Sequence, residues 1–105
     1  MYGAEESGGP RIGDVLAALD DPVRLEMVRR LANSAGPVQC KFLYDGISKS
    51  TASHHFAVLR EAGVTESISV DGAVHQRLRA GELERELPGV VRSIVAAVNR
   101  STYSR

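Results

Sequence analysis

Apolar side chains recur every three or four residues over most of the chain, which is the spacing of amphipathic helices. From residue 64 the pattern changes to loose alternation, which is typical of strands. Asp71-Gly72 divides this stretch, and Asp-Gly is a strong signal for a two-residue hairpin turn. The sequence therefore predicts a mainly helical domain with one small β-hairpin, in the order α-α-α-α-β-β-α. We expect helices at residues 12–19, 22–32, 38–44, 48–62 and 90–102, a hairpin at 64–79 and a short helical turn at 82–87.

Two of the predicted helices carry clear start and stop signals. Asp21 can cap the second helix, and Pro22 suits its first position, where the missing N–H costs nothing. Ser48 can cap the helix at 48–62 through its hydroxyl group. Gly63 follows that helix where the chain can close in the left-handed conformation that glycine adopts freely.

The helix at 48–62 has one apolar stripe, formed by Ala52, Phe56, Leu59 and Ala62. The side chains on its other face are small, hydroxylated and weakly basic, so this face could approach a groove closely and still offer hydrogen bonds. The spacing alone also suits an ordinary amphipathic surface helix.

The residue order gives a more specific indication. Residues 48–63, Ser-Lys-Ser-Thr-Ala-Ser-His-His-Phe-Ala-Val-Leu-Arg-Glu-Ala-Gly, closely resemble the recognition helix of bacterial ArsR-type winged helix-turn-helix repressors. Asp-Pro-Val-Arg-Leu at 21–25 resembles the start of the second helix in the same family. The resemblance covers roughly residues 12–100. It implies a transcriptional regulator, in most relatives a repressor, that dimerises through its first and last helices.

This resemblance assigns the helix at 48–62 to the major groove of operator DNA and the hairpin at 64–79 to the wing. The N-terminal half of the helix would read bases or hold phosphates, and the basic face of the hairpin would hold the flanking backbone. Ala57 stands where many relatives have a basic residue, which removes one expected phosphate contact. The predicted DNA-binding residues are Lys49, Ser50, Thr51, Ser53, His54, His75, Arg77 and Arg79.

The first and last helices are more apolar than a chain of 105 residues needs for its own packing. Packing within one chain would account for this pattern, and so would pairing with a second copy. We favour a homodimer, as the resemblance also implies. The predicted interface residues are Ile12, Val15, Leu16, Leu19, Val91, Ile94, Val95 and Val98.

The charge balance leaves a second function open. The chain has 13 Lys and Arg against 13 Asp and Glu, whereas nucleic-acid-binding domains usually carry a basic excess. Together with the acidic run at 82–86, this neutrality would suit a winged-helix protein–protein interaction module that no longer binds DNA. The basic residues of the central helix and the hairpin favour DNA.

Catalytic and metal-binding patterns are missing from the sequence. Neighbouring positions on a helix diverge by about 100°, so His54 and His55 cannot easily chelate one ion. We expect His55 at the buried edge and His54 pointing outward. Cys40, the single cysteine, suits small core filling, with a redox or metal role as the alternative. We therefore expect no enzyme, no metal and no cofactor, and the sequence does not identify an effector ligand.

The organisation along the chain is simple. Residues 1–10 are acidic and glycine-rich, and we expect a disordered tail there, followed by a single domain at 11–105. Neither a signal peptide nor a membrane-spanning stretch is apparent, so we expect a cytoplasmic protein whose partners are double-stranded DNA and a second copy of itself.

Overall fold

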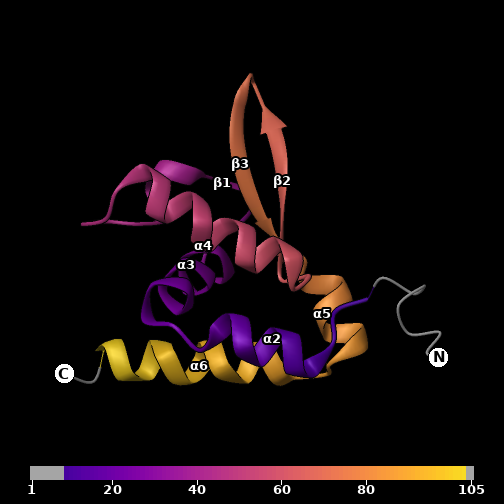
Figure 1. Cartoon of the computed structure of the whole chain (residues 1–105). Coiled ribbons are helices and arrows are strands. Elements are labelled where there is room, and N and C mark those ends of the chain that lie inside the picture. The colour runs from indigo at the N-terminus through magenta and orange to yellow at the C-terminus, as the bar shows by residue number, and fades with distance from the viewer. Residues whose placement is uncertain (1–8, 104–105) are drawn as a thin grey trace.

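The wing is a hairpin that projects from one end of the molecule, while the helices α2 (Ile12–Leu19) and α6 (Val90–Tyr103) lie at the opposite end (Figure 1). This computed structural model describes residues 9–103. It confirms the predicted class, a mainly helical winged helix with a small antiparallel sheet. The elements are α2 (Ile12–Leu19), α3 (Pro22–Ala32), β1 (Val38–Gln39), the 3₁₀ helix η1 (Cys40–Phe42), α4 (Lys49–Glu61), β2 (Thr65–Val70), β3 (Ala73–Leu78), α5 (Ala80–Glu86) and α6 (Val90–Tyr103).

The predicted boundaries of α3 and α4 are confirmed by their caps. The Asp21 carboxylate accepts hydrogen bonds from the first-turn N–H groups of α3, at 2.8 and 3.1 Å. Ser48 Oγ accepts the N–H of Thr51 at 3.0 Å. At the other end of α4, Gly63 has a φ of 82° and the N–H of Val64 donates to the carbonyl of Leu59 at 3.0 Å. A side chain at position 63 would be strained by that φ, so only glycine ends the helix in this way without cost.

The hairpin forms as the Asp-Gly signal predicts. Asp71 and Gly72 have φ values of 51° and 82°, the two positive values that a type I′ turn requires. The register runs from Val70 opposite Ala73 to Thr65 opposite Leu78.

The prediction of a helix at 38–44 is wrong. Val38 and Gln39 instead pair with Gln76 and His75 of β3, so β1 completes a sheet of order β1-β3-β2. Only the three-residue 3₁₀ helix η1 follows. The segment is too short to gain much from helix formation, and pairing with an available strand edge satisfies its backbone instead.

The core lies where α2, α3 and α4 meet, and its central side chains are fully excluded from solvent. Val15, Met27, Leu43, Leu59 and Val64 each have 0% exposure. Burying each such side chain contributes about 1.5–3 kcal/mol. The position of α4 is therefore fixed by burial of one entire face.

Arg29 and Arg30 of α3 are only partly exposed, and both form ion pairs. Arg29 and Arg30 both donate to the Glu26 carboxylate, at 2.7 Å each, and Arg30 also reaches Asp45 at 2.6 Å. The bond between Arg30 and Asp45 connects α3 to the segment that precedes α4. The hydrogen bonds from Arg29 and Arg30 lower the pKa of Glu26 from 4.5 to about 2, against the opposing effect of burial.

The lowered pKa of Glu26 makes the free energy of unfolding depend on pH. Its folded pKa lies below the unfolded value, so its contribution is present above about pH 4.5 and is lost as the pH falls toward 2. Because the side chain is 34% exposed, we discount the full shift for solvent screening. Glu26→Gln is expected to lower the free energy of unfolding by about 1–2 kcal/mol at neutral pH and by almost nothing near pH 2.

Urea denaturation at fixed protein concentration, near pH 7 and near pH 2.5, measures the effect. Glu61→Gln is the matched control, because Glu61 is exposed. An equal loss of stability for Glu26→Gln at both pH values would contradict the assignment.

The expected disordered tail at 1–10 falls mostly outside the described residues. Pro10, however, is buried, and it lies so close to Gly63 that a Cβ added there would meet its ring at 3.2 Å. The packed part of the chain therefore begins before residue 11.

Candidate nucleic-acid interface

The two faces of α4 are sharply different. Ala52, Phe56 and Leu59 are buried at 1, 6 and 0% exposure. Phe56 also meets Tyr44 edge-to-face, with ring centroids 6.2 Å apart. The opposite face presents the five residues that the sequence assigned to DNA on this helix, and all are exposed: Lys49, Ser50, Thr51, Ser53 and His54.

His55 fixes the orientation of this helix from its buried side. Its Nδ1 lies 3.0 Å from Arg24 Nη1, and Arg24 Nε donates to the carbonyl of Ala18 at 2.6 Å. Since a guanidinium can only donate, His55 accepts through Nδ1 and carries its proton on Nε2. Arg24 thus ties α2 and α3 to α4, and the expected buried position of His55 is confirmed.

The first turn of α4 combines hydroxyl groups with free backbone donors. Ser48 donates to Thr51 Oγ1 at 2.9 Å, and the Ser48 and Ser50 hydroxyls are 3.3 Å apart. The hydroxyl hydrogen of Thr51 remains available to an outside acceptor. A helix N-terminus also carries partial positive charge, so this turn suits a phosphate oxygen or a base edge.

A groove between α4 and the wing gathers cations that the sequence did not bring together. Lys41 of η1 and both Lys49 and Arg60 of α4 line it, and no carboxylate does. Within residues 9–103 none of the three has an ion-pair partner. Lys41 was missed because η1 and α4 are separate elements, so its approach to α4 is decided only by folding. Arg60 lies eleven residues after Lys49 on α4, about three helical turns, so helical spacing could have placed both on one face.

The wing arginines are less available than their alternation predicted. Arg77 is half exposed, and its Nε donates to Glu66, the residue opposite it in the hairpin, at 2.9 Å. Arg79 lies beyond β3, not on the basic face of the hairpin, and forms a two-point ion pair with Glu82 at 2.6 and 3.2 Å. The hydrogen bond from Arg79 lowers the pKa of Glu82, and the same bond raises the pKa of Arg79. Both guanidinium charges are therefore compensated within the chain.

Two further wing residues differ in their exposure. His75 is half-buried, and its Nδ1 lies 3.0 Å from the carbonyl of Ala73, which can only accept, so Nδ1 carries the proton. Gln76 is 2% exposed; its Nε2 donates to Ser67 at 2.9 Å and approaches Cys40 Sγ at 3.6 Å. Cys40 itself is half-buried against the core. Sequence patterning gave no signal for this buried glutamine.

The residues predicted for a dimer interface fall into three sets by their exposure. Val15, Leu19 and Val91 are 0, 4 and 6% exposed and belong to the core of the single chain. Ile12 and Leu16, one helical turn apart on α2, are 50 and 47% exposed. On α6, Ile94, Val95 and Val98 are half-buried.

Neither a metal-binding cluster nor a membrane-spanning helix is found among residues 9–103. Residues 9–103 contain no group of three or more His, Cys, Asp or Glu side chains placed to hold a metal ion. In the same part of the chain no helix is both long enough and apolar enough to cross a membrane.

Comparison with known proteins agrees with this architecture. A family model described as a helix-turn-helix domain matches residues 19–68. The uncharacterized HTH-type transcriptional regulator YceK of Bacillus subtilis is 33% identical over 82 residues, which are 76% of this chain and 82% of that protein.

Two solved structures share the fold. The transcriptional repressor BigR from Xylella fastidiosa matches with a TM-score of 0.63 and 26% identity, over 90% of this chain and 88% of that one. An ArsR-like transcriptional regulator from Rhodococcus sp. RHA1 matches with a TM-score of 0.62 and 23% identity, over 88% and 86%. The relatives are regulators, not enzymes. This chain belongs to the HTH-type transcriptional regulators, and it has the winged helix-turn-helix fold of an ArsR-like regulator.

Proposed function

We propose that this regulator is a cytoplasmic repressor that binds operator DNA as a homodimer, through the recognition helix at 48–62 and the wing at 64–79. The observation that carries the proposal is the exposed face of α4, where hydroxyl groups and a lysine stand on a helix whose other face is buried. Such a helix has the width and the donors to enter the major groove.

The unpaired cations support the same surface. Lys41, Lys49 and Arg60 surround the groove beside α4 and are not neutralised within the described chain. A net charge of zero is thus compatible with DNA binding, because the acidic residues mainly form ion pairs outside this groove. We assign these three side chains to phosphate groups and the exposed residues of the first α4 turns to bases.

The wing has a smaller electrostatic part in this proposal than the sequence predicted. Arg77 can exchange its partner Glu66 for a phosphate, since both side chains are 40–50% exposed. Arg79 is held at the base of the wing, and we now assign it a structural role there. His75 keeps a role at the flanking backbone through its Nε2 atom.

Two copies would place their recognition helices in successive major grooves, roughly 34–36 Å apart. The exposed pair Ile12 and Leu16 lies at the end of the molecule opposite the wing tip, so a partner bound there leaves both α4 surfaces free (Figure 1). Such a dimer would read an inverted repeat.

Fluorescence anisotropy tests the function. The protein is titrated against the DNA upstream of its own coding region and against an unrelated duplex, at two salt concentrations. We expect binding to the upstream fragment at least about a thousandfold tighter than to the unrelated duplex. If six cations per dimer contact phosphates, log K should fall against log salt with a slope of about −5.

Equal, weak and salt-sensitive binding to both duplexes would contradict operator reading at this site. Absence of binding to either duplex would favour the alternative, a winged-helix protein–protein interaction module. The compensated charges of Arg77 and Arg79 are the observation that keeps this alternative open.

A further inference from the structure

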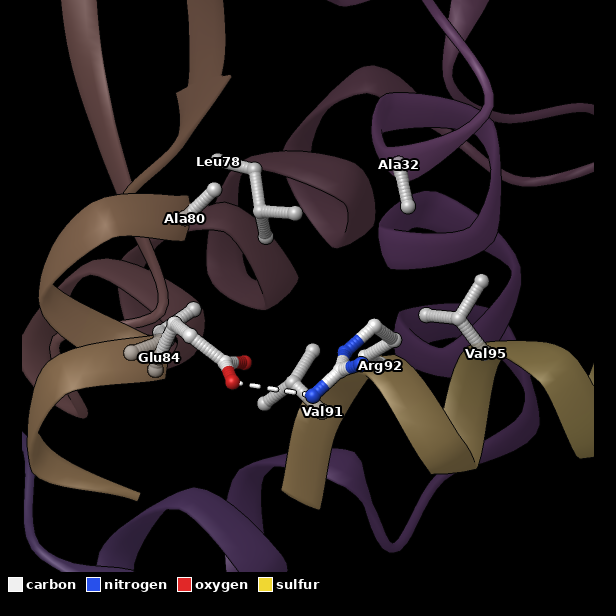
Figure 2. A pocket seen from close by; sticks show the side chains of 8 residues that line it. Ala32, Leu78, Ala80, Glu84, Val91, Arg92 and Val95 are labelled. Atoms are coloured by element: carbon white, nitrogen blue, oxygen red, sulfur yellow. Dashed lines mark hydrogen bonds and ion pairs between the residues drawn. The ribbon is translucent and has the colours of Figure 1, made fainter. Parts of the chain in front are cut away.

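A cavity of about 530 Å³ lies between the base of the wing and α6, away from the recognition surface (Figure 2). Four elements enclose it: the end of α3, the end of β3, α5 and the first half of α6. Its volume lies within the range of about 300–1,000 Å³ that is typical of small-molecule sites. The apolar lining residues are Ala32, Leu78, Ala80, Leu83, Val91 and Val95.

The cavity reaches the core and is not merely a surface dent. Leu83 and Val91 are only 2 and 6% exposed, yet both line it. Figure 2 shows Leu78 and Ala80 on one side of the space and Ala32 and Val95 on the other. An apolar occupant would therefore touch aliphatic groups on several sides.

The only charged groups of the lining neutralise each other. Arg92 Nη2 donates to Glu84 Oε2 at 2.9 Å, and Figure 2 shows this pair running along one edge of the space. The second oxygen of Glu84 accepts the N–H of Gly89 at 3.2 Å, which fixes the carboxylate. Both side chains are exposed, at 71 and 50%, so breaking this pair costs little by itself. A charged ligand would, however, meet only aliphatic groups in the rest of the lining, and leaving its charge unpaired there is costly. The remaining N–H groups of Arg92 can still donate to one neutral oxygen.

We propose that this cavity binds a small, uncharged molecule that has an aromatic or alicyclic body and one carbonyl or hydroxyl oxygen directed at Arg92. A second copy of the chain is the competing occupant, because Val95 also belongs to the predicted dimer interface. The exposed apolar pair of that interface, Ile12 and Leu16, lies on α2, which contributes no residue to the cavity. This exposed pair therefore lies outside the cavity, whereas Val91 and Val95 belong to both the cavity lining and the predicted interface. Use of the cavity by an effector would rest on the proposed function, whereas binding itself does not.

Three probes of similar shape test the chemistry: 2-naphthol, 2-naphthoate and 2-naphthylmethylamine, which are neutral, anionic and cationic near pH 7. Methyl NMR spectra follow Leu78, Leu83, Val91 and Val95 of the full chain during each titration. We expect 2-naphthol to shift these methyl signals saturably, with a dissociation constant on the order of 10–100 µM. Both charged probes should bind at least about tenfold more weakly.

Variants that place larger side chains in the cavity test whether 2-naphthol binds there. Ala32→Leu combined with Ala80→Leu places two larger side chains in the cavity and should weaken 2-naphthol binding at least about tenfold. The control is Ala35→Leu, a substitution at a nearby exposed residue that does not line the cavity, and it should bind as the wild type does. Circular dichroism confirms that each variant folds.

Several outcomes would overturn the proposal: no saturable shift, equal affinity for all three probes, or unchanged binding by the filled variant. Dissociation of the dimer by the filling substitutions, seen by sedimentation, would assign the space to the partner copy instead. Operator affinity is measured on the same samples. If the protein binds its operator but not 2-naphthol, only the proposal about the cavity is contradicted. If it binds 2-naphthol but not its operator, only the proposal about DNA binding is contradicted.

Discussion

Lys49→Ala combined with Ser53→Ala is expected to weaken operator binding by about a hundredfold or more, because each dimer loses the pair of contacts twice. Both side chains are exposed on the N-terminal half of α4, and neither belongs to the core. The folded structure should therefore be retained, while the phosphate contact of Lys49 and the base contact of Ser53 are lost. Anisotropy titration against the operator duplex, at one fixed salt concentration, measures the change.

Arg100→Ala combined with Ser101→Ala is the matched control, since it makes the same chemical change on exposed residues of α6. It should leave operator affinity within about twofold. Glu66→Gln provides a second comparison, because it releases Arg77 from its ion pair and should raise affinity severalfold. Unchanged operator binding by the Lys49 and Ser53 double variant would show that the reading face is misplaced.

Ile12→Asp combined with Leu16→Asp is expected to convert the protein into a folded monomer. Both side chains are about half exposed on α2, so the substitutions add charge to the surface that we assign to the partner and leave the core intact. Loss of the second half-site should reduce operator affinity by about 10²–10⁴-fold. Sedimentation velocity gives the oligomeric state, and circular dichroism gives the fold.

The choice of positions is essential for this experiment. Aspartate at Val91 would also be disruptive, but Val91 is 6% exposed in the core, so its loss would unfold the chain without testing the interface. Two aspartates at the exposed loop residues Ser34 and Ala35 are the control, and they should leave the dimer intact. An unchanged dimer in the α2 variant would move the interface to another surface.

The sequence by itself determined most of the local structure. Asp21 and Ser48 cap their helices and Asp71-Gly72 turns the hairpin because these signals act within a few residues, whatever the rest of the chain does. The two faces of α4 could also be assigned in advance, since a helix of fixed period has only one way to bury an apolar stripe. The order of residues 48–63 also showed which family the chain resembles.

Tertiary structure alone decided the contacts between distant segments. Val38 and Gln39 became a strand because β3 offered an unpaired edge, which no local pattern encodes. The expected basic face of the wing was largely neutralised because Glu66 and Glu82 fold against its arginines. The cations beside α4 and the cavity under the wing arise in the same way. The cations come from η1 and α4, the cavity joins residues of four elements, and only packing brings these elements together.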